Sequence, residues 1–307
     1  MQEIKTVALI GAGAVGASHA KYLHASLGPE YFRIIASEDR IRRYTEDGIY
    51  VNHERMPFQF VSPQSDDFHA DLILVGVKFS SLPQAISDIR NFVGTNTTIL
   101  SLLNGVTSEE EIAKVYGEEK LLFGYTLIDT AREGKSIISR KPGKIVFGEK
   151  DNRRTCRVEA VKAVFDKAGI LTDIPHDILH ELWWKYLFNT GINPLATILG
   201  GNIDLFQKHE EVRHSMILAQ REIIDIAKHA EISLSDADID RVLRFFDTAT
   251  PGTQPSMCQD VAAKRKTEID MLCGTAVNLG RSCGIQTPVN ELLLNMVKAI
   301  EDKYLSK

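Results

Sequence analysis

The sequence predicts an α/β protein whose first half forms a doubly wound parallel sheet and whose second half is an all-helical domain. Strand-like apolar segments alternate with helix-like segments through the first half of the 307-residue chain, which is typical of a parallel sheet built from βαβ units. A glycine-rich loop follows the first of these strands. After Pro175 the strand pattern gives way to helical periodicity. We therefore expect one domain over residues 1–175 and a second over 176–307.

Four segments of the first domain predict buried parallel strands, because each is a short run rich in apolar or β-branched residues. They cover residues 5–10, 32–37, 70–78 and 97–105. Between residues 120 and 150 the pattern changes to short β segments separated by Gly and Pro, which predicts an antiparallel extension of the same sheet. A helix over 157–169 and a last strand over 170–175 complete the domain.

Helical periodicity marks the segments of the second domain. The predicted helices cover residues 177–193, 210–230, 236–249, 256–280 and 288–304. Pro194 should end or kink the first of them, because a proline disfavours helical backbone at the residue before it.

Composition and charge indicate which partners to expect. The formal net charge is −5, from 36 basic and 41 acidic residues, so nothing indicates a nucleic-acid surface. No apolar run reaches the roughly 18 residues of a membrane helix, and the N-terminus lacks the pattern of a signal peptide. The four cysteines show neither a CxxC pair nor zinc spacing. We therefore expect a cytoplasmic protein with reduced thiols and no membrane partner.

The loop between the first strand and the first helix, GAGAVG, matches the GxGxxG fingerprint of dinucleotide sites. Gly11 permits a tight turn, Gly13 allows backbone to approach a pyrophosphate, and Gly16 lets the helix pack on the strand. Free N–H groups at the helix N-terminus favour phosphate. A glycine turn without a ligand and a flavin site are the alternatives, and the helical second half disfavours flavin. The sequence thus predicts a Rossmann-type domain that holds a dinucleotide at Gly11, Ala12, Gly13, Ala14, Val15 and Gly16.

The end of the second strand bears on the choice between NADPH and NADH. An acidic residue there holds the ribose hydroxyls of NAD, whereas hydroxyl or basic groups accommodate the 2′-phosphate of NADP. Ser37 occupies the selector position and Arg40 is close enough to reach a phosphate, which favours NADPH. Glu38 favours NADH, and a solvated helix start is the alternative for all three residues.

A polar strip runs along the predicted helix 177–193. Glu181, Lys185, Asn189 and Asn193 recur every four residues on a helix that is otherwise largely apolar, so they share one face. Such a strip faces solvent, a partner or a ligand. The exposed face of an amphipathic helix and the wall of a polar site are equally compatible with this spacing.

A second strip is predicted on the helix 256–280, where Ser256, Asp260, Lys264 and Glu268 again recur every four residues. Ser256 with Gln259 also fits a capping box, and the three charged residues fit surface ion pairs. Two such strips facing each other would form a polar cleft.

These residues suit the reduction of a keto acid. Reduction of a ketone by a dihydronicotinamide needs a proton donor and a cation beside the developing alkoxide, and a lysine provides both. Asn104 and Lys78 follow the fourth and third strands at their C-terminal ends, where open α/β sheets bind ligands. Asn104 could instead be a turn residue. His176 and His180, spaced i and i+4, could bind a metal, but no third ligand is evident, and we expect surface histidines and no metal site.

The chain resembles the ketopantoate reductase family (2-dehydropantoate 2-reductases) over nearly its whole length. The resemblance rests on GAGAVG at 11–16, LLNGV at 102–106, ELWWKYLFNTGINPL at 181–195, and SMCQD followed by KTEID within 256–270. It implies that Lys185 is the general acid and that Glu268 binds the substrate hydroxyl and contacts the cofactor. It also implies further contacts with substrate or cofactor, made by Asn104, Asn189, Asn193, Ser256 and Lys78.

The resemblance implies NADPH-dependent reduction of 2-dehydropantoate to pantoate, in the synthesis of pantothenate and coenzyme A, by an enzyme that could be a homodimer. The chain departs from the family pattern at Ser37, where many members carry an arginine that contacts the 2′-phosphate. Two alternatives stay open. One is a related dehydrogenase for another small 2-keto or 3-hydroxy acid, and the other is a non-catalytic dinucleotide sensor.

Overall fold

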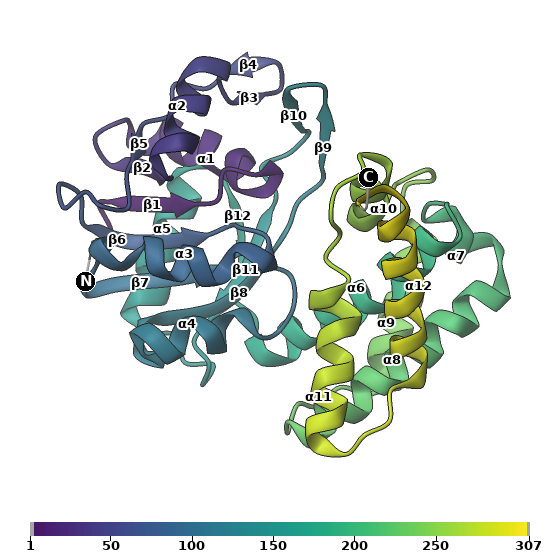
Figure 1. The fold of residues 1–307 in the computed structure, drawn as a ribbon. Coiled ribbons are helices and arrows are strands. Elements are labelled where there is room, and N and C mark those ends of the chain that lie inside the picture. The colour runs from purple at the N-terminus through teal and green to yellow at the C-terminus, as the bar shows by residue number, and fades with distance from the viewer. Residues whose placement is uncertain (1–2, 306–307) are drawn as a thin grey trace. The chain divides into compact units, whose positions relative to one another are not determined.

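A computed structural model describes residues 3–305, and the chain divides into one compact unit up to Ile178 and another from Leu179. The N-terminal unit contains an eight-stranded sheet in the order β12-β11-β8-β7-β6-β1-β2-β5 (Figure 1). Neighbouring strands are parallel except β8 and β11, which are antiparallel. The strands are β1 (Val7–Ile10), β2 (Phe32–Ile35), β5 (Phe60–Val61), β6 (Ala70–Val75), β7 (Val93–Ser101), β8 (Leu121–Leu127), β11 (Lys144–Gly148) and β12 (Leu171–Asp173). The predicted doubly wound sheet is confirmed.

The helices of this unit cover both faces of the sheet. They are α1 (Ala14–Leu27), α2 (Glu38–Asp47), α3 (Leu82–Asp88), α4 (Ser108–Tyr116) and α5 (Cys156–Lys167), with short 3₁₀ turns η1 (Phe79–Ser81), η2 (Arg90–Phe92) and η3 (Glu118–Lys120). The chain leaves β1 toward β2 and leaves β6 toward β7, in opposite directions along the sheet. Right-handed crossovers therefore put α1 and α3 on opposite faces and open a crevice at the C-terminal ends of β1 and β6.

A second, four-stranded sheet was not predicted. Its order is β4-β3-β10-β9, from β3 (Tyr50–Val51), β4 (Glu54–Arg55), β9 (Thr130–Glu133) and β10 (Ser136–Ser139). The antiparallel extension predicted over 120–150 is correct for β8 and β11 but wrong for β9 and β10. The amide side chain of Asn52 holds β10 by two hydrogen bonds to the backbone of Ser139, at 3.0 and 2.8 Å. This partner is 87 residues away in the chain, so no local pattern indicates it.

The C-terminal unit is helical, and residues 179–305 contain no strand. Its elements are α6 (Ile178–Ile198), α7 (Asp204–Lys208), α8 (Glu210–His229), α9 (Asp236–Thr248), α10 (Ser256–Ala262), the π-helix η4 (Asp270–Gly274), α11 (Thr275–Cys283) and α12 (Pro288–Leu305) (Figure 1). The prediction of an all-helical second half is confirmed.

Pro194 does not end α6, which continues to Ile198. Beyond the proline, Leu199 N again donates to Leu195 O at 3.0 Å. Residues 191–197 are all buried. Their packing therefore outweighs the local preference of the residue before a proline, which was the basis of the prediction.

The single helix predicted over 256–280 is wrong, because α10 ends at Ala262. Lys264 has a left-handed backbone (φ +52°), and Arg265 N donates to Asp260 O at 2.8 Å. Such a bond across six residues is typical of a helix C-terminus. Residues 256–273 contain no Gly or Pro, so the sequence continues the helical pattern through the point where α10 stops.

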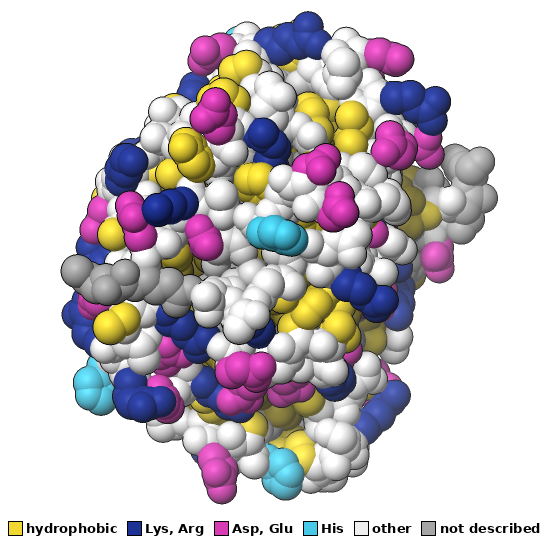
Figure 2. Space-filling view, turned by 90° about the vertical axis from the view of Figure 1, so that its left-hand side faces the viewer, with side chains coloured by type: hydrophobic (Ala, Val, Ile, Leu, Met, Phe, Trp, Pro, Cys, Tyr) yellow, Lys and Arg dark blue, Asp and Glu magenta, His cyan; other side chains and the backbone are white. Residues whose placement is uncertain are grey.

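The length of the helices and the charges on the surface bear on the prediction of no membrane and no nucleic-acid partner. No helix among residues 3–305 is long and apolar enough to cross a membrane. On the face shown in Figure 2, basic and acidic side chains are interspersed rather than segregated.

Candidate active site

The glycine loop lies between β1 and α1, at the crevice of the sheet. Gly11 has φ +101°, and a Cβ there would lie 2.5 Å from the carbonyl carbon of Gly76, while a Cβ on Gly16 would overlap Gly11 O. Both glycines are therefore required by the packing of the chain itself. At Gly13, by contrast, a Cβ would meet no atom within 4 Å. Exposed backbone at the N-terminus of a 14-residue helix fits the pyrophosphate of a dinucleotide.

Ser37 and Arg40 lie at the start of α2, which follows β2 at the same edge of the sheet. Ser37 is the N-cap residue, but its hydroxyl makes no capping hydrogen bond. Ser37, Glu38 and Arg40 are all exposed, and Arg42 pairs with Asp39. The loop thus presents both the residues that favour NADPH and the glutamate that favours NADH.

Lys78 and Asn104 also belong to this edge. Lys78 follows β6 and is exposed, and Asn104 follows β7 and is half-buried, just before Gly105 (φ +98°). Because β1, β2, β6 and β7 are parallel, their C-terminal ends meet at one edge. The structure therefore brings the predicted residues of the first domain to one edge of the sheet.

Lys185 lies on α6 in the C-terminal unit and is half-buried. Its Nζ is 4.9 Å from the centroid of the Phe188 ring. Burial lowers the pKa of Lys185 to about 8. Lys185 forms no ion pair with any residue in 3–305. A lysine with this pKa is protonated at neutral pH and releases its proton more readily than an exposed one.

Asn189, Asn193 and Ser256 form a connected group. Asn189 and Asn193 are 6 % and 5 % exposed, and the side chain of Asn193 donates to Asn189 O at 3.3 Å. Asn193 Oδ1 accepts from Ser256 Oγ and from Met257 N, both at 3.2 Å. The capping box predicted for Ser256 with Gln259 is therefore wrong, because Asn193, from another helix, satisfies the first turn of α10.

The predicted second strip does not exist as a helix face. Asp260 pairs with Arg265 at 2.8 Å, and Lys264 is exposed beyond the end of α10. Glu268 is half-buried in the connection to η4, where its carbonyl accepts from Met271 N and Leu272 N. Of the strip, Ser256 is joined to the Lys185 helix by its hydrogen bond to Asn193.

Glu181, the first member of the α6 strip, has a structural partner. It binds Arg241 through two hydrogen bonds of 2.7 and 3.0 Å. The guanidinium carbon of Arg241 lies 3.6 Å from the centroid of the Trp184 ring. Glu181 thus links α6 to α9, which the spacing of the strip did not indicate.

The two histidines differ in their surroundings. His176 is exposed, as predicted. His180 is half-buried, with Nε2 3.1 Å from Asp238 Oδ1, so the prediction of a surface histidine is wrong there. The neighbouring carboxylates of Glu181 and Asp238 raise the pKa of His180. Residues 3–305 contain no group of three or more His, Cys, Asp or Glu side chains that could hold a metal.

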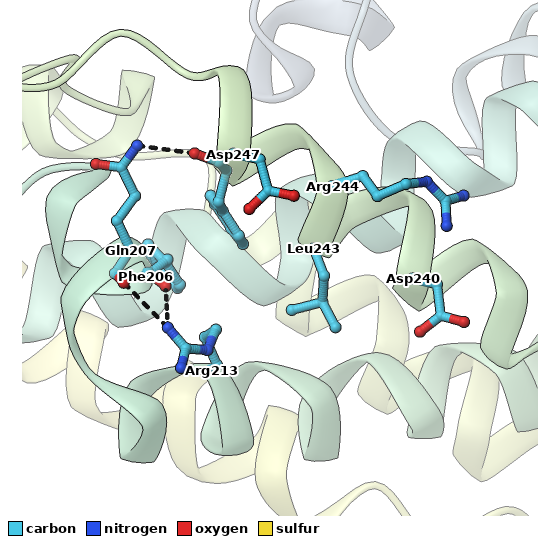
Figure 3. Close-up of a pocket in the computed structure, with 8 residues that line it drawn as sticks. Phe206, Gln207, Arg213, Asp240, Leu243, Arg244 and Asp247 are labelled. Carbon is cyan, nitrogen blue, oxygen red and sulfur yellow. Dashed lines mark hydrogen bonds between the residues drawn. The ribbon is translucent and has the colours of Figure 1, made fainter.

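A cavity of about 690 Å³ lies elsewhere in the C-terminal unit, among α7, α8 and α9 (Figure 3). Its lining residues are Phe206, Gln207, Arg213, Asp240, Leu243, Arg244, Phe246 and Asp247. The Arg213 guanidinium donates to Phe206 O and Gln207 O, at 3.0 and 3.1 Å. None of the site residues predicted from the sequence lines this cavity.

Comparison with known proteins identifies the family. The profile "Ketopantoate reductase PanE/ApbA" matches residues 7–152, and "Ketopantoate reductase PanE/ApbA C terminal" matches 177–301. The chain belongs to the ketopantoate reductase family. It is accordingly an oxidoreductase with a Rossmann-type domain, as the sequence predicted.

Relatives match over nearly their full length. The 2-dehydropantoate 2-reductase of Aquifex aeolicus is 27 % identical, over 95 % of this chain and 96 % of that protein. The structure of 2-dehydropantoate 2-reductase from Geobacter metallireducens has a TM-score of 0.83 and 26 % identity, over 96 % of this chain and 99 % of that one. A D-mandelate dehydrogenase in complex with NADH has a TM-score of 0.86 and 25 % identity, over 97 % and 99 %.

Proposed function

We propose that this ketopantoate reductase family member reduces 2-dehydropantoate to pantoate with NADPH, as a step toward pantothenate and coenzyme A. The observation that carries the proposal is Lys185, a half-buried lysine whose burial lowers its pKa to about 8. It shares a helix with Asn189 and Asn193, which are linked to Ser256. These groups are the donors that a 2-keto acid requires.

The N-terminal unit is suited to hold the dinucleotide. In this proposal Gly11 to Gly16 bind the pyrophosphate, Lys78 and Asn104 lie near the nicotinamide, and Glu268 is a further cofactor contact. The bound dihydronicotinamide supplies a hydride to the carbonyl carbon. The open space at Gly13 supports this fit, because backbone can approach the phosphates there without obstruction.

In the proposed mechanism Lys185 donates its proton to the carbonyl oxygen as that oxygen becomes an alkoxide. Its positive charge stabilises the negative charge that develops on the oxygen before the transfer. Asn189, Asn193 and Ser256 position the keto acid through hydrogen bonds. Glu268 accepts a hydrogen bond from the substrate hydroxyl, which distinguishes ketopantoate from simpler keto acids.

The substrate assignment predicts that ketopantoate has the highest kcat/KM in a panel of 2-keto acids. Ketoisovalerate, which lacks the hydroxyl, leaves Glu268 without its substrate partner, and such a site rejects the analogue by about 10⁴-fold or more. NADPH oxidation measures both rates. Glu268→Gln is the matched variant, and it should reduce the difference between the two substrates. Equal turnover of both acids by the unmodified enzyme would exclude the assignment.

The cofactor preference is tested by titration with NADPH and NADH. We expect tighter binding of NADPH, and we expect Arg40→Ala to weaken NADPH binding while leaving NADH binding nearly unchanged. Arg42→Ala is the control, because Arg42 is already paired with Asp39 in the same helix. Tighter binding of NADH by the unmodified protein would show that Glu38 determines the preference.

A second candidate function is NADH-dependent reduction of a bulkier 2-keto acid. It is supported by Glu38 and by the similarity to the NADH complex of D-mandelate dehydrogenase. The same panel decides between the two functions when phenylglyoxylate and NADH are included. Faster turnover of phenylglyoxylate than of ketopantoate would favour this second candidate.

We also propose a homodimer in the cytoplasm. Leu292 and Met296, one turn apart on α12, are 59 % and 41 % exposed and would be covered by a second subunit. Sedimentation velocity tests the dimer, and cell fractionation tests the location.

A further inference from the structure

A chain of buried polar groups lies beneath the turn that carries Asn104. Ser101, at the end of β7, is fully buried, and Ser108 and Glu109, at the start of α4, are each 2 % exposed. Leu103 N donates to Ser101 Oγ at 3.3 Å, and the hydroxyls of Ser101 and Ser108 are 2.8 Å apart. Ser108 Oγ donates to Glu109 Oε2 at 2.9 Å.

The groups at the two ends of this series of hydrogen bonds determine which hydroxyl is the donor in each bond. The Leu103 N–H can only donate, and the proton of Ser108 is directed to Glu109, so Ser101 donates to Ser108. Every donor therefore points toward the Glu109 carboxyl group. The backbone N–H groups of Glu109 itself and of Gly124 on β8 favour the ionised form of this carboxyl group and so partly oppose the rise in its pKa. Through the two serine hydroxyls, the Glu109 carboxyl group on α4 is thus connected to the end of β7 and to the backbone of the turn at residues 102–107.

Burial raises the pKa of Glu109 to about 7, and the neighbouring carboxylate of Glu110 adds to the rise. α4 packs mainly against α3, η3 and β8, and Ser108 also contacts β7, which has no ionisable residue. β8 has no ionisable group other than Tyr125, while α3 and η3 contribute the ionisable residues Asp88, Glu118, Glu119 and Lys120. Near neutral pH the carboxyl therefore changes between its neutral and ionised forms.

We propose that Glu109 is a positioning residue that acts through Ser108 and Ser101 to hold the backbone at Leu103 and thereby to place Asn104. When ionised, Glu109 makes charge-assisted hydrogen bonds and polarises the hydrogen bonds through Ser108 and Ser101. These stronger bonds hold the turn firmly. When protonated, Glu109 makes weaker bonds and the turn loosens. The inference rests on the proposed function in one respect, namely that Asn104 contacts substrate or cofactor.

The test compares Glu109→Gln with Glu110→Gln, its exposed neighbour in the same helical turn. In the unmodified enzyme we expect KM for the keto acid to rise as the pH falls through about 7. The rise should be on the order of 3- to 10-fold, the difference between a charge-assisted and a neutral hydrogen bond. Glu109→Gln should show the high KM at every pH with little change in kcat. Glu110→Gln should keep the low KM at alkaline pH and the rise in acid, with the rise moved slightly to lower pH because the Glu110 charge is gone.

Ser101→Ala removes a different link from the same series of hydrogen bonds between Leu103 and Glu109. It should raise KM as Glu109→Gln does, and the double variant should be no worse than either single variant, because both remove the same connection. Additive effects, or a Glu109→Gln enzyme with the KM and pH dependence of the unmodified one, would overturn the proposal.

Hydrogen exchange separates this inference from the proposed function. The amides of residues 102–107 should exchange faster in Glu109→Gln than in Glu110→Gln at alkaline pH and equally fast at acid pH, with or without any substrate. If ketopantoate is not turned over but this exchange difference is present, the assigned substrate is wrong and the role of Glu109 stands. If ketopantoate is turned over and the exchange difference is absent, the role of Glu109 is wrong.

Discussion

The lowered pKa of Lys185 suits its proposed role as a proton donor, and it also carries a structural cost. Its folded pKa, about 8, is lower than the 10.5 of an exposed lysine, so folding disfavours its charged form. This cost is present below pH 8 and disappears as the pH rises through the interval between these two values. One pKa unit corresponds to about 1.4 kcal/mol, so this cost in the free energy of folding is at most about 3 kcal/mol.

Lys185→Met should therefore lower activity and raise stability together. We expect kcat to fall by about 10²- to 10⁴-fold, the usual contribution of a general acid, with NADPH binding retained. We also expect the free energy of unfolding at neutral pH to rise by up to about 3 kcal/mol. Steady-state kinetics and urea unfolding measure the two effects.

The matched control for this prediction is Lys185→Arg. It keeps the charge but is a far weaker acid with a planar head group, so kcat should recover poorly and stability should not increase. The unmodified enzyme should lose activity as the pH rises through about 8. A folded Lys185→Met enzyme with nearly normal kcat would eliminate Lys185 as the proton donor.

Sequence spacing predicted the shared face of Lys185, Asn189 and Asn193, and the structure joins Asn193 to Ser256, from a different predicted strip. The same spacing placed Glu181 on this face without deciding whether it belongs to a site, and the structure shows that it forms an ion pair with Arg241. Periodicity identifies a face of a helix, but it cannot tell which members of that face find a partner on another helix. That depends on tertiary packing.

At the scale of elements, a lysine occupies the position that ends α10. Lys264 has φ +52°, a left-handed conformation that glycine adopts with less strain. Lys264→Gly should therefore raise the free energy of unfolding by about 0.5–1 kcal/mol. Lys264→Ala removes the same charge but keeps the strain, so it should give no gain. Equal stabilisation by both substitutions in urea unfolding would show that charge, not backbone, is responsible.

A strand or helix could be predicted where its own residues carry the signal, and not where it depends on residues far away in the sequence. Strands β1, β2, β6 and β7 were identified because parallel strands buried on both faces are continuously apolar. The end of α10 was missed because the residues around Lys264 have good helix propensity and the signal that ends a helix is usually a glycine. The second sheet was missed because β3 and β10 stabilise each other across a long separation in the chain.

At the scale of the N-terminal unit, two buried groups have opposite effects on stability as the pH changes. His19 is fully buried, with Nε2 2.8 Å from Thr126 Oγ1, and burial lowers its pKa from 6.5 to about 4. It therefore destabilises the fold as the pH falls from 6.5 toward 4. The raised pKa of Glu109 stabilises the fold below about 7, with the full effect reached below 4.5.

We expect these two contributions, each about 3 kcal/mol, largely to cancel between neutral and mildly acid pH. Glu109→Gln should remove one contribution, so that the variant loses stability in acid more steeply than the unmodified protein. His19→Gln should do the reverse and become relatively more stable in acid. Urea unfolding over a series of pH values measures the slopes, with Glu110→Gln as the control. Parallel pH profiles for all four proteins would contradict the balance.

The pairing of β3 with β10 also bears on the order in which the protein can assemble during synthesis. Asn52 leaves the ribosome 87 residues before Ser139, its hydrogen-bonding partner. During that interval the β3–β4 hairpin has an open edge, and closing so long a loop costs entropy that local contacts do not repay. The small sheet is therefore among the last parts of the nucleotide-binding unit to form, and the nascent chain carries an unprotected strand until translation has passed β10.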